Sequence, residues 1–206
     1  MHLKISSISN LTDARFFSAI GAHYLGFCFD VLHPQNIPIE KANEIIKWLH
    51  HPVLVGEFGQ HQTKEEIEFI ANKIGLNDIQ IPFNHPQKVH FHFDKFLTIT
   101  DTNLINDNVE FSDLDFIVLK IDETRIQNIF SENKNVASLP SPEITQLKQF
   151  ISQHHVFIDT IFTKENILPI VETLQPYGIQ ITCQAEHKSG ISNVDDYAEI
   201  VVLVGF

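Results

Sequence analysis

Acidic side chains recur at the ends of apolar segments along this chain. The acidic residues at or after the end of such a segment are Asp30, Asp101, Asp122, Asp159 and Glu186, and Glu57 lies within one. If the segments are parallel strands of one barrel, their carboxyl ends meet at one face, where barrel proteins place their active sites. Carboxylates converging there would form a negative basin for a metal, an amine or another cation. The simpler interpretation is a solvated rim, because loops are ordinarily polar.

Histidine and lysine side chains add weaker signals. His90 and His92 could share a strand face and bind a metal with Asp94, but two histidines on a short connector are more often surface residues. We therefore predict no metal site and no cofactor. Lys4 and Lys120 are expected to point into the barrel and pair with carboxylates, and a Schiff-base role for either is the alternative.

Eight short apolar segments alternate with helical patterns along the chain. Most are continuous apolar runs, which is typical of parallel strands covered on both faces. The segments are residues 3–6, 24–29, 53–58, 78–83, 96–100, 116–121, 156–159 and 178–182. This order predicts an α/β fold, a (β/α)8 TIM barrel. The alternative is an open doubly wound sheet, which usually needs fewer strands.

The helical patterns between the segments carry start and stop signals. Thr63 and Glu66 form a capping-box pattern that predicts a helix ending at Gly75. Pro169 predicts that the helix within residues 164–175 begins late or is kinked.

The length of the chain constrains the barrel. A barrel of this kind typically takes about 250 residues, so a chain of 206 residues requires economies. Residues 84–95 and 102–114 look too short and irregular for full helices, which predicts shortened helices in the middle units. No linker rich in Gly, Ser or Pro divides the chain. We therefore predict a single compact domain over residues 1–206.

Composition excludes several classes of partner. The formal net charge is −12 and the only arginines are Arg15 and Arg125, so the chain lacks the basic face of a nucleic-acid binder. No apolar run is long enough for a membrane span, and polar residues interrupt the N-terminus where a signal peptide would be apolar. Two cysteines, Cys28 and Cys183, are too few for a disulfide framework, which favours the cytoplasm. Cys183 would be reactive only if cations lowered its pKa, and its acidic surroundings argue against that.

Two long stretches resemble the phosphoribosylanthranilate isomerase family, the barrel of the tryptophan pathway. Residues 3–30, LKISSISNLTDARFFSAIGAHYLGFCFD, are similar to the family's opening Lys-Ile-Cys-Gly-Ile-Thr-Asn, Asp-Ala helix and Gly-Ala-Asp-x-Leu-Gly-Phe-x-Phe. Residues 162–196 are similar to its Asn-Val helix, Tyr-Gly-Val-Asp strand and Ser-Gly-Val-Glu close. The resemblance spans most of the chain, is weakest over residues 84–155, and implies the same barrel fold.

The resemblance also implies an activity, because this family opens the ribose ring of an aminoaldose and moves a proton from C2. The family uses a cysteine as general base and an aspartate as general acid, and Ser6 and Lys120 stand at these positions. A serine hydroxyl is no base at neutral pH unless another group deprotonates it. Asp122, two residues after Lys120, is a candidate substitute for the acid, and Asp159 is a candidate base.

The family's phosphate-binding glycines are also replaced. The family holds phosphate on backbone N–H groups of the loops after strands seven and eight. Asp159, Thr160 and Ile161 stand at its Ala-Gly-Gly position, Cys183 and Gln184 at its Ser-Gly position, and Gln35 at its substrate-binding arginine. Because side chains obstruct these amides and Asp159 repels anions, we predict that no phosphate binds there.

The residues support three hypotheses about function. The first is a barrel of this family that has lost the isomerase chemistry and binds another small molecule or a protein partner. The others are an active isomerase with relocated acid and base, and an enzyme of another class. We favour the first because a fold does not determine function. The candidate ligand-binding residues are Asp30, Gln35, Glu57, Asp101, Thr160, Ile161, Cys183 and Gln184. The ligand is unidentified, and a homo-oligomer is a further option.

Overall fold

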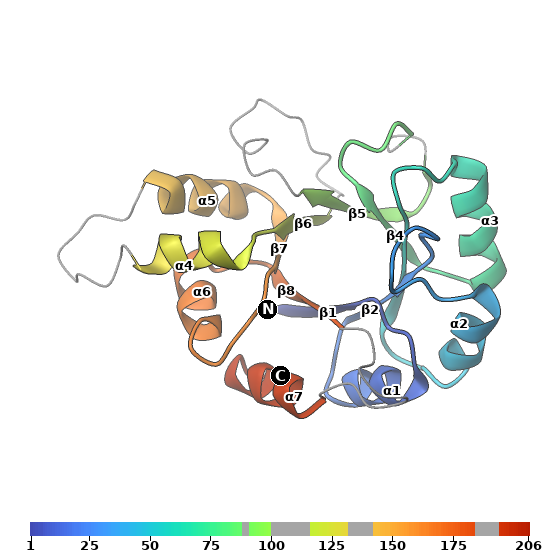
Figure 1. Ribbon diagram of the computed structural model, residues 1–206, viewed down its shortest axis with the longest axis horizontal. Helices are drawn as coiled ribbons and strands as arrows, with labels where there is room; N and C mark the ends of the chain where they lie inside the picture. Colours follow the sequence, from blue (N-terminus) through green and yellow to red (C-terminus); the bar gives the residue numbers. More distant parts are fainter. Residues whose placement is uncertain (88–90, 100–115, 132–141, 184–193) are drawn as a thin grey trace.

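Eight parallel strands form a closed barrel in a computed structural model that describes residues 1–87, 91–99, 116–131, 142–183 and 194–206 (Figure 1). The strands are β1 (His2–Ser6), β2 (Tyr24–Cys28), β3 (Val53–Glu57), β4 (Asp78–Pro82), β5 (Asp94–Ile99), β6 (Phe116–Lys120), β7 (His155–Asp159) and β8 (Gly178–Thr182). Each strand pairs with the next in chain order, and β8 pairs with β1. The predicted (β/α)8 barrel is therefore confirmed, and the open sheet is wrong.

Helices surround the barrel on the outside (Figure 1). They are α1 (Leu11–Ala19), α2 (Ile39–Ile46), α3 (Lys64–Ile74), α4 (Glu123–Ser131), α5 (Pro142–Gln153), α6 (Ile167–Leu174) and α7 (Val194–Leu203). Between β4 and β5 the described residues contain no helix, so the economy predicted for 84–95 is confirmed there. The second stretch, 102–114, lies outside the described residues. No described helix is long and apolar enough to cross a membrane.

The local signals of α3 and α6 have the expected effect. The Thr63 hydroxyl accepts a hydrogen bond from the Glu66 N–H, and the Glu66 carboxylate accepts one from the Thr63 N–H. Gly75 ends α3 with a φ of 76°, the left-handed conformation that glycine adopts at little cost. Helix α6 begins only at Ile167, so Pro169 lies in its first turn, where its missing N–H is not needed.

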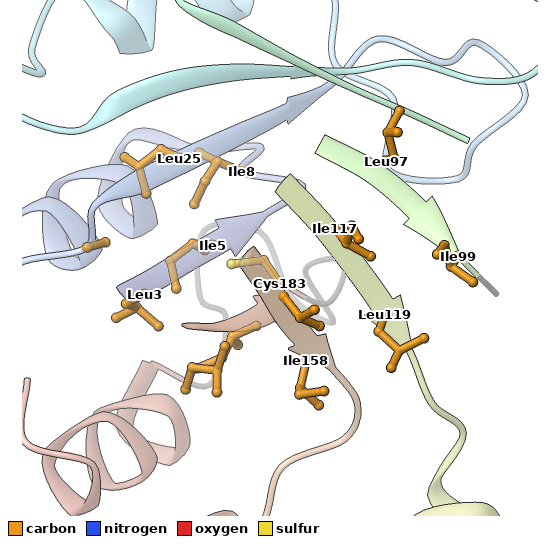
Figure 2. Close-up of a cluster of buried hydrophobic side chains, with 14 of the residues drawn as sticks. Leu3, Ile5, Ile8, Leu25, Leu97, Ile99, Ile117, Leu119, Ile158 and Cys183 are labelled. Atoms are coloured by element: carbon orange, nitrogen blue, oxygen red, sulfur yellow. The ribbon is translucent and has the colours of Figure 1, made fainter. Parts of the chain in front are cut away.

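Side chains alternate between two cores along each strand. The inner core, inside the barrel, contains Val55, Phe96, Val118 and Phe157, with Tyr24, Phe116 and Tyr177 packed against them. The outer core lies between strands and helices and includes Ile5, Leu25, Ile117 and Ile158 (Figure 2). Both faces of the strands are buried, which explains why the strands are continuous apolar runs in the sequence.

The same alternation directs polar side chains into the C-terminal end of the barrel. Lys120 follows Val118 by two residues at the end of β6, and Asp159 follows Phe157 in the same way at the end of β7. Lys120 is also the register partner of Asp159. The two side chains therefore lie on neighbouring strands, on the inner face and at the mouth of the barrel.

The opposite, N-terminal end of the barrel holds two carboxylates. Asp78 at the start of β4 is buried and is the register partner of Asp94, the first residue of β5. Burial first, and then the charge of Asp94, raise the pKa of Asp78 to about 7, while Lys4 acts in the opposite direction. This end of the barrel therefore contains a carboxyl group that titrates near neutral pH.

Candidate functional site at the barrel mouth

Lys4 and Glu57 form a buried ion pair beneath the mouth. The Lys4 Nζ lies 2.8 Å from the Glu57 Oε1, and the two side chains are 0% and 8% exposed. Strand β2 separates β1 from β3, and the pair passes over Gly26, where a Cβ would lie 2.0 Å from the same Oε1. The expectation that Lys4 points inward and pairs with a carboxylate is confirmed.

Ser7 connects this ion pair to the serine at the family's cysteine position. Its backbone N–H and its hydroxyl both donate to the Glu57 Oε2, at 3.0 and 3.3 Å. Ser7 has a φ of 60°, a left-handed conformation that costs a residue with a side chain roughly 1 kcal/mol. It stands at the glycine position of the Lys-Ile-Cys-Gly motif. The Ser6 Oγ lies 3.3 Å from the Ser7 Oγ. The Ser6 hydroxyl therefore bonds to another hydroxyl, whereas the nearby carboxylate already receives three donors.

Asp159 is a buried carboxylate without an ion pair in the part of the chain that the structure describes. It is 6% exposed, and its Oδ2 accepts a hydrogen bond of 3.0 Å from the Nε2 of Gln180. Burial raises the pKa of Asp159 to about 6, and the charge of Glu57 adds to this, while Lys120, Lys4 and the Gln180 bond lower it. A carboxyl group with this pKa can gain or lose a proton near neutral pH.

Lys120 lies at the rim beside Asp159. Its side chain is exposed, and it forms no ion pair with any described carboxylate, contrary to the sequence expectation. It lowers the pKa of Asp159 through the longer-range attraction between their charges. Lys120 therefore partly offsets the negative charge of Asp159 without occupying its oxygens.

Asp122 and Asp30 serve local turns. The Asp122 Oδ1 accepts the N–H of Arg125 at 2.9 Å, which makes the exposed Asp122 a cap for α4. The Asp30 Oδ1 accepts the N–H of Leu32 at 2.9 Å, in the loop after β2. Both bonds are typical of capping carboxylates.

Only two of the four described acidic candidates, Glu57 and Asp159, face the interior of the barrel mouth. Lys4 already neutralises Glu57. Asp101 and Glu186 lie outside the described residues, as does His90, while His92 and Asp94 are exposed. Within the described ranges, no group of three or more His, Cys, Asp or Glu could hold a metal ion. The charge left for a ligand among these residues is that of Asp159.

The loop after β2 reaches across to the end of β8. The Nε2 of Gln35 donates to the carbonyl of Cys183, so the residue at the family's arginine position holds two loops together. Cys183 is 1% exposed and belongs to the cluster drawn in Figure 2. Burial, and then the charges of Asp13 and Glu57, raise the pKa of its thiol, so it is a packing residue. Gln184 lies outside the described residues.

The turn after β7 contains Thr160 and Ile161, the residues that the sequence analysis places at the family's glycine positions. The Asn166 Nδ2 donates to the carbonyl of Ile161 at 2.9 Å, and the Ile161 side chain is 57% exposed. The Thr160 Oγ1 is buried and has no hydrogen-bond partner among the residues that the structure describes. Thr160 and Ile161 thus form the start of the loop that follows β7.

Three contributors to the site have no local signal in the sequence. Gly26 matters because two non-adjacent strands place an ion pair over it, and the conformation of Ser7 depends on its bond to Glu57. Gln180 faces Asp159 through strand register. The family motifs do point to two of these residues. Ser7 stands at the glycine of Lys-Ile-Cys-Gly, and Gln180 stands at the aspartate of Tyr-Gly-Val-Asp.

Comparisons with known proteins agree with the architecture. No protein-family model matches the chain. An N-(5'-phosphoribosyl)anthranilate isomerase of Rubrobacter xylanophilus is 23% identical over 196 residues, and the match covers 91% of each chain. A second such isomerase, of Sulfurihydrogenibium sp., is 23% identical over 209 residues, and the match covers 99% of this chain and 98% of the relative. The crystal structure of phosphoribosyl anthranilate isomerase from Thermus thermophilus superposes with a TM-score of 0.72 at 19% identity, over 99% of this chain and 98% of that one.

The two sequence relatives and this crystal structure thus carry the same name and extend over nearly the whole chain. The motifs that carry the resemblance lie on β1, α1, β2, α6 and β8 of this barrel. The chain is thus similar over nearly its whole length to phosphoribosylanthranilate isomerases, and it shares the (β/α)8 barrel of the solved structure.

Proposed function

We propose that this barrel binds a small molecule at its mouth and does not catalyse the isomerisation for which its relatives are named. The observation that carries the proposal is the state of Glu57. This carboxylate is the acidic group closest to Ser6 through hydrogen bonds, and it already accepts bonds from Lys4 and from Ser7. A carboxylate that is held in an ion pair is a weak base, so nothing beside Ser6 is suited to take its proton.

The acid position supports the same proposal. Lys120 replaces the family's aspartate, and an ammonium group gives up its proton poorly at neutral pH. Asp122 is occupied as the cap of α4. General acid and base groups typically contribute about 10²- to 10⁴-fold each, so the loss of both leaves little of the reaction.

The loop after β7 supports a different ligand. The family's phosphate lies on glycine amides, whereas Thr160 and Ile161 add side chains there and Asp159 adds a buried negative charge. A phosphorylated substrate would place its anion beside that carboxylate.

The two free cysteines favour a reducing compartment, and we propose the cytoplasm on that basis.

Purified protein tests the proposal directly. We expect no conversion of N-(5'-phosphoribosyl)anthranilate above the uncatalysed rate, with the Rubrobacter xylanophilus relative as the positive control. A Ser6→Cys/Lys120→Asp variant restores only the family's acid and base, and we expect it to stay inactive because the phosphate cradle is missing. Turnover by the unmodified protein would overturn the proposal.

The second candidate is an active isomerase in which Asp159 serves as the relocated base. The observation in its favour is the pKa of about 6, which suits proton transfer near neutral pH. In that case Asp159→Asn should abolish turnover, and the rate should rise with pH through about 6 as Asp159 ionises.

A further inference from the structure

Within the described part of the chain, the inner wall of the barrel between β7 and β8 presents two side chains with unused acceptor capacity. Among the described residues only Gln180 donates a hydrogen bond to the Asp159 carboxylate, although a carboxylate can accept several. The Oε1 of Gln180 has no hydrogen-bond partner in the described ranges, and Gln180 is 2% exposed. Buried polar atoms in proteins are nearly always bonded, so the two acceptors indicate a missing donor.

The charged side chains around Asp159 do not supply that donor. Lys4 on β1 donates to Glu57 on β3, which satisfies the charges of both. Lys120 on β6 is exposed and forms no ion pair with a described residue. Leaving a buried carboxylate with a single amide bond is costly, and a cation with several N–H groups would remove that cost.

We propose that Asp159 and Gln180 form the recognition site for a primary ammonium group on a small ligand. An ammonium group has three donors and one positive charge, which match one carboxylate and one amide carbonyl. A divalent metal would need more oxygen ligands than these two side chains provide. The inference rests on the proposed binding function and names the chemical class of the ligand.

The charge balance predicts how pH affects binding. The ammonium group binds to the ionised form of Asp159, so affinity should fall as pH drops through about 6 and Asp159 becomes protonated. The groups that face Asp159 are Lys120 on β6, Lys4 on β1, Glu57 on β3 and Gln180 on β8. None of the other three charged groups is a histidine.

Ethanolamine and its uncharged analogue ethylene glycol test the proposal. Calorimetric titration and thermal shift at about pH 8 should show binding of ethanolamine only, and at about pH 5 the binding should weaken at least tenfold. Asp159→Asn keeps the shape and removes the charge, and it should weaken ethanolamine binding at least tenfold at about pH 8. Lys120→Met should tighten binding severalfold, because it removes a competing cation.

Other results would overturn the proposal. Equal binding of ethylene glycol, or unchanged ethanolamine affinity in Asp159→Asn, would show that the carboxylate does not recognise an ammonium group. Weaker binding of ethanolamine by Lys120→Met, or binding of inorganic phosphate, would indicate an anion site. Stronger binding of Mg²⁺ than of ethanolamine would indicate a metal site. If Asp159→Asn does not fold, Gln180→Met, which removes the free acceptor, should weaken ethanolamine binding in its place, and unchanged affinity would refute the site. Isomerase turnover is measured separately, so its appearance would refute the proposed function without deciding the ammonium site.

Discussion

The buried ion pair between Lys4 and Glu57 allows a quantitative prediction. At 2.8 Å and an effective dielectric constant of 20, two unit charges attract each other by roughly 6 kcal/mol. Removing two ions from water costs several kcal/mol each, so the net contribution of the intact pair to stability is small. Deleting one partner is different, because it leaves the other charge buried and unpaired.

Lys4→Met should therefore lower the free energy of unfolding by about 3–5 kcal/mol, and Glu57→Gln by a similar amount. The double variant Lys4→Met/Glu57→Gln should be less destabilised than the sum of the two, with a coupling energy of about 2 kcal/mol or more. Urea unfolding followed by circular dichroism measures all three differences.

A surface ion pair of the same chain provides the control. Lys73 and Glu40 lie 3.7 Å apart with side chains 44% and 78% exposed. Lys73→Met should cost less than about 1 kcal/mol, because solvent screens exposed pairs. The reasoning fails if Lys4→Met costs no more than Lys73→Met, or if the effects at Lys4 and Glu57 simply add.

Two further predictions concern groups away from this pair. The pKa of Asp78 is about 7 in the folded protein against an ordinary value of 3.8. Between these two pH values the folded state binds more protons than the unfolded state, so the free energy of unfolding should fall as pH rises. After allowance for solvent screening, Asp78→Asn should raise the free energy of unfolding by about 2 kcal/mol at about pH 8 and change it little at about pH 4. Equal effects at the two pH values would contradict this prediction. Cys183 should resist an uncharged thiol reagent in the native protein and react once urea unfolds the chain, whereas fast native reaction would contradict its burial.

The fold could be predicted from the sequence because nearly every strand is buried on both faces. Strands such as β3 and β6 then appear as continuous apolar runs, and their limits are visible within a residue. Strand β5 was placed too late, at residue 96, because it begins with Asp94 and Lys95 at the open N-terminal end of the barrel. A polar strand end has no apolar signal.

The candidate site was harder to predict, because its contacts connect distant parts of the chain. Because both faces of each strand are apolar, the sequence does not indicate which face lies inside the barrel. The inward direction of Asp159 follows only from the inner core around Phe157. The pairing of Lys4 with Glu57 depends on barrel closure and on Gly26. Asp122 did have a local signal, because an Asp three residues before the N–H it accepts is typical of a helix cap.

The polar residues inside the mouth form one connected set of charges and hydrogen bonds. The family motif places an aspartate where this chain has Gln180, and Gln180 is the register partner of both Lys4 and Asp159. A carboxylate at both 159 and 180 would set two negative charges side by side, whereas the glutamine amide donates to Asp159. With a neutral residue at 180, Lys4 takes Glu57 as its partner across Gly26. Among the described residues inside the mouth, Lys4 thus neutralises Glu57, and Asp159 is the carboxylate that keeps no ion pair, which is the group that the proposed ammonium site uses.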